Sequence, residues 1–248
     1  MSLSDQELER YARHIVLPQV GGAGQRKLKD ASVAVVGAGG IGSAVIPALA
    51  GAGIGRLTII DFDTVEIANL HRQPLFAEAD AAKPKAQLAA GFISRLNRFV
   101  EADPMQERIG PENATRLLTG HDLAIDGSDN FATRLAVSDA CVGLGIPLVS
   151  AAAVQFQGQV GLFRSKPCYR CFVGDAFDAD DCDNCAELGV LGALTATVGS
   201  FAALLAINTI VGIGDDEARK VHIFDGETLD WRAIRIPADP GCRACGSA

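Results

Sequence analysis

The chain has 248 residues, of which 48% are hydrophobic and 21% charged, with 30 acidic against 22 basic side chains and a formal net charge of -8. This length and apolar content support a sizeable core and exclude a disordered or low-complexity protein. The pI of about 5.0 and the lack of any basic run give no electrostatic footprint for a nucleic acid or an anionic membrane. A bound phosphate must therefore be held by a local cluster of cations.

The N-terminal segment is acidic and amphipathic, and it lacks the basic and apolar regions of a secretion signal. We therefore expect a cytoplasmic protein. Residues 188–214 carry no charge and are long enough to span a bilayer, but polar residues within the stretch and acidic residues at both ends favour a buried helix. Seven cysteines without an export signal indicate free thiols or a metal site rather than disulfides.

The first elements in chain order predict a parallel sheet. Ser4 and Glu7 have the spacing of a capping box, which predicts an N-terminal helix. Strands are then expected at 32–36, 57–60, 123–126 and 147–151, and helices at 44–52, 84–98 and 131–144. This alternation is typical of a doubly wound sheet with helices on both faces.

The pattern changes after residue 151, where adjacent strands replace the alternation. One pair, 154–157 and 159–163, flanks Gly158, and a second pair, 221–224 and 231–236, flanks a turn at Gly226. Such pairs are expected to be antiparallel. The sequence therefore predicts a single α/β domain with a Rossmann-like mixed sheet, parallel in its N-terminal half and antiparallel in its C-terminal strands.

A glycine motif follows the first expected strand and opens the first helix of the sheet. Gly37, Gly39 and Gly42 permit a tight turn whose backbone N–H groups meet a phosphate at the positive end of a helix. Asp61 lies 19 positions after Gly42, at the end of the next strand, where its carboxylate can accept hydrogen bonds from ribose hydroxyls. These residues alone fit a nicotinamide or flavin dinucleotide, and a turn used only for helix packing is the structural alternative.

Cations near this motif favour a triphosphate instead. Arg72 and Lys85 follow Asp61 along the chain, and no Gly-Lys-Ser/Thr loop is present, so a P-loop mechanism is excluded. Asp129 comes just after another strand, where it is placed to hold Mg²⁺ at the same edge of the sheet. The alternative for both cations is solvated surface charge.

Three Cys-x-x-Cys pairs occur, at 168/171, 182/185 and 242/245. A tetrahedral structural Zn²⁺ needs two such pairs. Spacing alone favours the first two pairs, because only ten residues separate Cys171 from Cys182 whereas 70 separate Cys171 from Cys242.

The motifs together resemble one family, the bacterial sulfur-carrier adenylyltransferases. These are the molybdopterin-synthase and thiamine-biosynthesis activating enzymes, which are related to ubiquitin-activating enzymes. The resemblance covers nearly the whole chain and rests on Arg10-Tyr-Ala-Arg13, Gly37-x-Gly-Gly-x-Gly42, Asp61-Phe-Asp-Thr-Val65, Asn69-Leu-x-Arg-Gln73, Lys83-Pro-Lys85, Asp126-Gly-Ser-Asp-Asn130, Cys168-Tyr-Arg-Cys171 and Pro240-Gly-Cys-x-x-Cys245.

The resemblance implies a homodimer that binds ATP with Mg²⁺ and a ubiquitin-like carrier protein ending in Gly-Gly. The implied reaction is attack of the carrier's C-terminal carboxylate on the α-phosphate of ATP, which gives an acyl adenylate and pyrophosphate. A carboxylate is already a nucleophile, so the work of such an enzyme is alignment and charge neutralisation. The implied parts are an N-terminal helical arm at 1–30, a nucleotide-binding half at 31–151 and a carrier-binding half with a zinc clip at 152–248.

The resemblance also implies roles for individual residues. N–H groups would come from the loop with Gly37, Gly39, Gly40 and Gly42. The nucleotide would lie at Asp61 and Asp63, with Asp61 on the ribose, and its phosphates would be contacted by Asn69, Arg72, Gln73 and Lys85. Mg²⁺ would be held by Asp129. Arg13 would reach the ATP site of the partner subunit. Zinc would be held by Cys168, Cys171, Cys242 and Cys245, against the pairing that spacing favours.

Cys185 matches a loop cysteine that some relatives use in the transfer step. Nearby carboxylates disfavour its thiolate, so a loop thiol without a catalytic role is the alternative. Cys182 has no counterpart in the motif. The sequence does not disclose which carrier is served, and a separate sulfurtransferase is expected as a partner. Two further interpretations stay open: an NAD(P)-dependent oxidoreductase, supported only by the glycine turn and Asp61, and a non-catalytic scaffold that binds the carrier.

Overall fold

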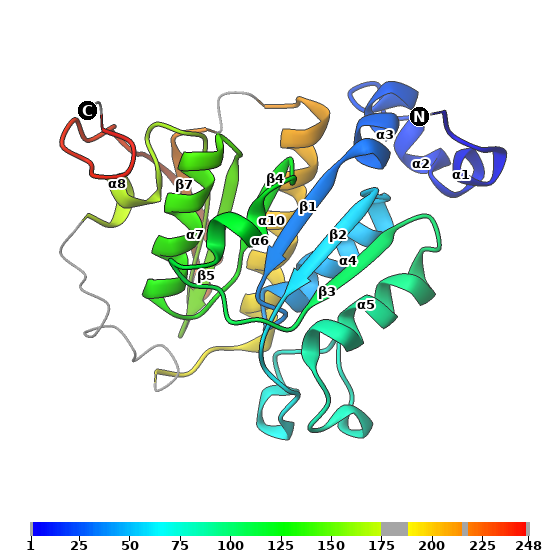
Figure 1. Ribbon diagram of the computed structural model, residues 1–248, viewed down its shortest axis with the longest axis horizontal. Coiled ribbons are helices and arrows are strands. Elements are labelled where there is room, and N and C mark those ends of the chain that lie inside the picture. Colours follow the sequence, from blue (N-terminus) through cyan, green and yellow to red (C-terminus); the bar gives the residue numbers. More distant parts are fainter. Residues whose placement is uncertain (1, 175–187, 215–217, 247–248) are drawn as a thin grey trace.

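A computed structural model describes residues 2–174, 188–214 and 218–246 of the chain. One eight-stranded sheet, in the order β3-β2-β1-β4-β5-β6-β7-β8, forms its centre (Figure 1). The strands are β1 Ser32–Val36, β2 Arg56–Ile60, β3 Glu101–Met105, β4 Leu123–Asp126, β5 Leu148–Val154, β6 Gln157–Phe163, β7 Lys220–Asp225 and β8 Asp230–Arg235. Pairing is parallel from β3 through β5 and antiparallel from β5 through β8. The predicted mixed sheet is confirmed.

Helices cover both faces of the sheet, as Figure 1 shows. The helices are α1 Asp5–Arg10, α2 Ala12–Ile15, α3 Gly21–Asp30, α4 Gly42–Ala52, α5 Lys85–Leu96, α6 Ala114–Leu118, α7 Phe131–Leu144, α8 Tyr169–Val173 and α10 Gly192–Val211, with short 3-10 turns η1 Ile67–Asn69 and η2 Glu78–Asp80. Successive residues of β1 alternate between two cores: Val33 and Val35 pack with α4, α5 and α10, whereas Ala34 and Val36 pack with α6 and α7. The parallel strands therefore end between two helical layers, where their carboxyl ends form one edge.

The long uncharged stretch forms α10, which packs against α4, β5 and β6. By length and composition α10 is apolar enough to cross a membrane, and half of the apolar window is buried within the protein. A single such helix is weak evidence for a membrane span, because the core helix of a soluble protein passes the same test. The packing agrees with the predicted buried helix.

Two strand predictions differ from the structure. The expected break at Gly158 between strands 154–157 and 159–163 is wrong, since β6 runs through this residue and the chain reverses at Gln155 and Phe156, where Gln155 has a φ of 52°. Gly158 serves a close packing contact instead, because a Cβ there would lie 2.4 Å from Val198 Cγ2. Strand β3 was not expected at all: it contains Pro104 and polar residues, which an edge strand tolerates.

Candidate functional site

The glycine loop joins β1 to α4 at the carboxyl edge of the parallel strands. Gly37 has a φ of +90° and its N–H donates to the Ile60 carbonyl at 2.9 Å. A Cβ on Gly42 would lie 2.2 Å from the Gly37 carbonyl oxygen, so a side chain at this position cannot fit without displacing the turn. Gly39 and Gly40 lie between them, at the start of α4. The loop therefore presents the positive end of a helix to this edge of the sheet.

Asp61 links the glycine loop to the end of β2. Asp61 is 8% exposed, and its carboxylate oxygens accept hydrogen bonds from the Ala38 N–H at 2.7 Å and the Asp63 N–H at 2.8 Å. Burial raises the pKa of Asp61, and the two backbone donors and the charge of Lys85 oppose this shift. Each carboxylate oxygen keeps a further lone pair, which is what a ribose hydroxyl requires.

Lys85 is a buried cation beside these carboxyls. The residue is 4% exposed, its Nζ lies 3.5 Å from Asp63 Oδ2, and its N–H donates to the Asp63 carbonyl. Lys83, two positions earlier, keeps 55% of its side chain exposed and pairs with Asp80. Lys83 is therefore a solvated surface charge, but Lys85 is not. Burying an ammonium group costs free energy unless an opposite charge or a hydrogen-bond acceptor lies beside it, and Asp63 lies beside Lys85.

Residues 69–73, from the last residue of η1 onward, bring three polar side chains to the same edge. Arg72 Nη2 donates to Asn69 Oδ1 at 2.7 Å, and the Arg72 N–H donates to the Asn69 carbonyl. Gln73 is 4% exposed, its Nε2 would lie 3.7 Å from a Cβ placed on Gly39, and its Oε1 has no hydrogen-bond partner among the described residues. A buried amide oxygen without a partner beside the glycine loop is suited to a polar ligand.

Asp129 lies in the loop between β4 and α7, which is held in place by Asp126, a residue of the motif at 126–130, and by Arg134, which sequence reasoning did not single out. Asp126 is fully buried and accepts from the Ser128 N–H at 3.0 Å, and Arg134 donates from Nε and Nη2 to the Ser128 carbonyl at 3.1 and 2.7 Å. Asp129 itself is exposed. The sequence signal for Arg134 is a basic residue at the fourth position of the helix that follows Asp129.

The loop of Asp129 also packs on the glycine loop. A Cβ on Gly37 would lie 3.2 Å from the Gly127 carbonyl oxygen, and a Cβ on Gly127 would lie 2.9 Å from Ile41. The structure thus brings the glycine loop, Asp61, Lys85, Gln73 and the Asp129 loop to one edge of the sheet. An exposed carboxylate there offers the oxygen ligand that Mg²⁺ prefers.

Asp126 gives this region a pH-dependent stability. Burial is the main cause that raises the pKa of Asp126 above its ordinary value of 3.8. The Asp126 carboxyl therefore binds its proton more tightly in the folded chain than in the unfolded chain. The stability that this protonated carboxyl contributes is fully present below the pKa of Asp126 in the unfolded chain, and it is lost as the pH rises through the pKa of Asp126 in the folded chain. Asp126→Asn is expected to lose less stability than wild type over that range. Urea unfolding at a series of pH values checks this, with the exposed Glu66→Gln as control; parallel curves for wild type and Asp126→Asn would contradict it.

The structure does not bring Arg13 to this edge within one chain. Arg13 is exposed on α2, and the preceding Tyr11 packs at Gly53, where a Cβ would lie 2.4 Å from the tyrosine Cζ. Gly53 caps the C-terminal end of α4, about 16 Å along that helix from the glycine loop. Figure 1 likewise shows α1 to α3 beyond the amino ends of β1 and β2.

Four cysteines from two distant segments meet near α8. The Sγ atoms of Cys168, Cys171, Cys242 and Cys245 all lie within 4.8 Å of one another, with 3.6 Å between those of Cys168 and Cys242 and 3.4 Å between those of Cys171 and Cys245. Four thiolates around Zn²⁺ at about 2.3 Å would stand about 3.8 Å apart, so the donor set fits a structural zinc. The pair favoured by spacing, 182/185, lies outside the described residues, as does the transfer role considered for Cys185.

Within the cluster the pKa values shift in opposite directions: burial raises the pKa of Cys168 and of Cys245, whereas the pKa of Cys242 is lowered. Burial opposes ionisation of the Cys242 thiol, but the N–H groups of Cys245 and Ala244 and the neighbouring thiols lower its pKa to about 7. The Asp239 N–H donates to Cys171 Sγ at 3.5 Å. Backbone donors to sulfur stabilise thiolates, which are the form that binds a metal.

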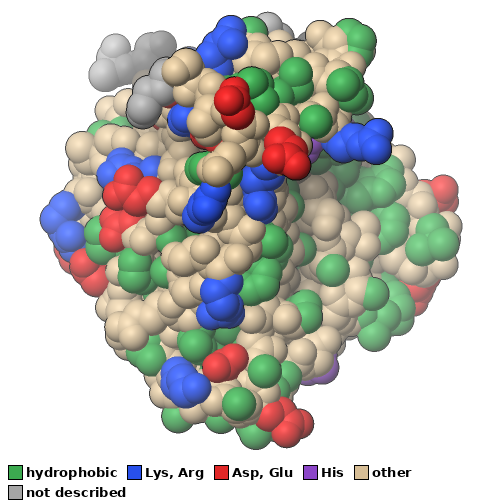
Figure 2. Space-filling model, turned by 90° about the vertical axis from the view of Figure 1, so that its right-hand side faces the viewer, with side chains coloured by type: hydrophobic (Ala, Val, Ile, Leu, Met, Phe, Trp, Pro, Cys, Tyr) green, Lys and Arg blue, Asp and Glu red, His purple; other side chains and the backbone are tan. Residues whose placement is uncertain are grey.

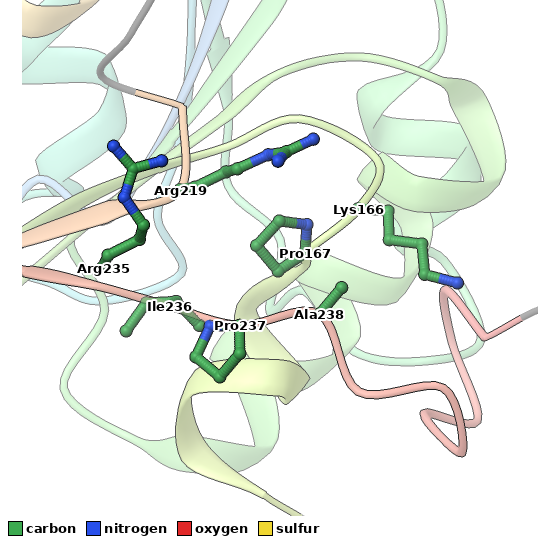
Figure 3. Close-up of a pocket in the computed structure, with 7 residues that line it drawn as sticks. All are labelled: Lys166, Pro167, Arg219, Arg235, Ile236, Pro237 and Ala238. Atoms are coloured by element: carbon green, nitrogen blue, oxygen red, sulfur yellow. The ribbon is translucent and has the colours of Figure 1, made fainter.

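A pocket of about 580 Å³ lies beside the cluster, at the end of the sheet away from the glycine loop (Figure 3). It is lined by Lys166, Pro167, Arg219, Arg235, Ile236, Pro237 and Ala238. None of these residues belongs to the glycine-loop edge. In Figure 3 Arg235, Arg219 and Lys166 project in different directions rather than toward one point.

The sheet, the glycine loop and the acidic and basic side chains around it define a nucleotide-binding α/β protein. The chain belongs to the ThiF family, whose model matches residues 11–244. It is 42% identical to a sulfur carrier protein adenylyltransferase of Thermus thermophilus, over 99% of this chain and 93% of that protein. It is 38% identical to a molybdopterin-synthase adenylyltransferase of Salmonella typhimurium, over 98% of both chains.

Solved structures share the fold at lower identity. MccB of E. coli, in a crystal structure with MccA-N7isoASN, matches with a TM-score of 0.85 at 22% identity, over 99% of this chain and 76% of that one. This similarity bears on the fold alone. It agrees with the single mixed sheet and its two helical layers.

Proposed function

We propose that this protein is an ATP-dependent adenylyltransferase that activates the C-terminal Gly-Gly carboxylate of a ubiquitin-like sulfur-carrier protein. The observation that carries the proposal is the buried Lys85 beside Asp61 and Asp63 at the glycine loop, since a desolvated cation at this place is what a triphosphate needs. Membership of the ThiF family and the adenylyltransferase names of both relatives support it.

In the proposed reaction a carboxylate oxygen of the carrier attacks the α-phosphorus of ATP. The bond from that phosphorus to the oxygen bridging the α- and β-phosphates breaks, and pyrophosphate leaves with the electron pair. No proton is transferred, so no general base is needed. The chain's contribution is to align the two substrates and to stabilise the negative charge that develops on the phosphate oxygens.

The residues at the carboxyl edge divide this work. The N–H groups of Gly39 and Gly40 donate to phosphate oxygens, since those of Gly37 and Ala38 are used within the fold. Asp61 accepts from the ribose hydroxyls. Lys85 and Arg72 neutralise phosphate charge, with Asn69 orienting the Arg72 guanidinium and Gln73 offering its amide. Asp129 would hold Mg²⁺, which when bound supplies further charge neutralisation on the triphosphate. Asp126 and Arg134 position the Asp129 loop.

The two other interpretations are weaker. A dinucleotide oxidoreductase explains the glycine turn and Asp61 but gives no use to a buried lysine at the phosphates. A non-catalytic scaffold would have no need to keep Arg72, Lys85 and Asp129 together with an intact glycine loop. Both alternatives also lack support from the adenylyltransferase names of the relatives.

We also propose that the active form is a homodimer in which Arg13 completes the site of the partner subunit. Arg13 is far from the glycine loop of its own chain, and Leu8, Val16 and Leu17 nearby leave 43%, 71% and 48% of their surface exposed. Figure 2 shows hydrophobic side chains among mixed charges on the face that carries this arm. Exposed apolar residues in such number are typical of an interaction surface.

Arg13→Ala and Asp129→Ala are expected to complement each other if Arg13 acts across the dimer. Each variant alone has two defective sites, whereas a mixed dimer keeps one site with both residues intact. Mixing the two inactive proteins and allowing subunit exchange should restore up to about a quarter of wild-type activity. No recovery after proven exchange would contradict the cross-subunit role.

Lys85→Ala is expected to lower the rate of ATP–pyrophosphate exchange by about a hundredfold, because one preorganised phosphate contact is removed. Lys83→Ala is the matched control, since it deletes the same charge two positions away from a side chain that is mostly exposed. Steady-state exchange rates of both variants check the prediction. Equal effects would show that only general charge matters.

In the C-terminal half the proposed features are a zinc site and a cysteine for the transfer step. The four-cysteine cluster holds a structural Zn²⁺ that clips the C-terminal segment of the carrier-binding half, 152–248, to α8. Cys185 serves the later transfer step. We propose that a separate sulfurtransferase supplies sulfur here, and that the protein works in the cytoplasm.

Exchange of labelled pyrophosphate into ATP tests the function. Wild-type protein should catalyse exchange only with a sulfur carrier that ends in Gly-Gly, and the same carrier lacking its last glycine should not support it. Tight NAD(H) binding without any carrier-dependent exchange would instead favour the oxidoreductase.

A further inference from the structure

The positions proposed for the phosphates and the ribose fix where the base of the nucleotide must lie. The phosphates belong at the glycine loop after β1, and the ribose belongs at Asp61 after β2. The base is attached to the ribose on the side away from the 5′-phosphate. Because the strand order is β3-β2-β1, the base must extend over the ends of β2 and β3.

An aromatic ring and a guanidinium are stacked at this place. Phe62 follows Asp61 directly, and Cζ of Arg108 lies 3.8 Å from the centroid of its ring. The ring remains 40% exposed, and Arg108 is exposed as well. The Asp61 N–H donates to the Met105 carbonyl at 3.1 Å, which joins the end of β2 to the end of the strand that leads to Arg108.

The backbone of Arg108 is held firmly although its side chain is at the surface. Asn113 Nδ2 donates to the Arg108 carbonyl at 3.0 Å, and the Gly110 N–H donates to Asn113 Oδ1 at 2.8 Å. The next residue, Ile109, is 6% exposed and packs in the core with α6 and α7. The guanidinium is thus presented from a turn with a fixed backbone and lies over the Phe62 ring.

We propose that Arg108, backed by Phe62, is the platform on which the base of the nucleotide stacks. One face of the planar guanidinium lies on Phe62 and leaves the other face for a second π system. A purine offers a larger ring surface to this platform than a pyrimidine does. Arg108 is therefore a specificity-determining residue that favours ATP over CTP, and this inference rests on the proposed adenylyltransferase function.

The test is the dissociation constants of ATP and CTP with Mg²⁺, measured by isothermal titration calorimetry on the full chain without carrier. Arg108→Ala is expected to weaken ATP binding by about tenfold and CTP binding by much less, so the preference for ATP falls. Arg108→Lys keeps the charge but has no planar group to stack, so it should lose the same preference. A purely electrostatic role would weaken both nucleotides equally and would be restored by lysine.

The control is Arg98→Ala, because Arg98 also lies over a phenylalanine, with Cζ 5.1 Å from the Phe99 ring, at the amino end of β3. This variant should keep the wild-type affinities for both nucleotides. An unchanged ATP-to-CTP ratio in Arg108→Ala overturns the inference while the proposed function stands. If wild-type protein binds no ATP, the proposed function fails and the inference falls with it.

Discussion

Asp129→Ala is expected to reduce carrier-dependent ATP–pyrophosphate exchange by about 10³-fold. Asp129 is the exposed carboxylate of a loop that packs against the glycine loop, so it can hold a divalent cation at the phosphates. Its removal would leave the charge of the leaving pyrophosphate to be balanced by Arg72 and Lys85 alone. The measurement is the exchange rate as a function of Mg²⁺ concentration.

Asp122→Ala provides the matched control for this experiment. Asp122 directly precedes β4, the strand that Asp129 follows, and its Oδ2 accepts from the Ser32 N–H at the opposite edge of the sheet. This variant is expected to lose some stability and to keep its exchange activity with an unchanged Mg²⁺ dependence. If Asp129→Ala retained wild-type exchange, the role proposed for that loop would be wrong.

Cys242→Ser is expected to abolish stoichiometric zinc binding and to lower the free energy of unfolding by several kcal/mol. The cluster joins Cys168 and Cys171 to a segment some 70 residues later, and a metal that closes so long a loop removes much conformational freedom from the unfolded chain. Serine is a poor zinc ligand beside three thiolates. Metal analysis by mass spectrometry and thermal unfolding with and without a chelator measure the two effects.

Two other cysteines serve as controls for the zinc prediction. Cys141 is a buried core residue of α7, and burial raises the pKa of its thiol to about 12, so Cys141→Ala should bind zinc as wild type does. Cys182→Ser should also keep stoichiometric zinc. Loss of zinc in Cys182→Ser together with its retention in Cys242→Ser would favour the pairing that sequence spacing predicts.

Local sequence signals predicted the elements that carry the glycine-loop edge of the sheet. Helix α7 has the predicted bounds, strand β1 lies at the predicted residues, and the Ser4 capping box is present. These features depend on nearest neighbours in the sequence. The glycine turn and the position of Asp61 were also predicted from local sequence, since each directly follows a strand that the sequence pattern locates.

Features that depend on distant parts of the chain could not be read from local patterns. Gly158 was expected to separate two strands, because its packing partner Val198 lies on a helix far along the sequence. The Arg108–Phe62 stack joins the ends of two strands, and nothing in the spacing of these residues indicates it. Spacing also favoured another cysteine pairing, because sequence separation does not show that the C-terminal segment returns to Cys168.

The central claim is that this edge of the sheet directs a carrier carboxylate to the α-phosphate of ATP. Intact-mass spectrometry of a Gly-Gly carrier, after incubation with the protein, ATP and Mg²⁺, tests it most directly. We expect a carrier species heavier by one adenylyl group, which forms with wild-type protein and is absent with Asp129→Ala. An unmodified carrier under conditions where wild-type protein is saturated with ATP would contradict it.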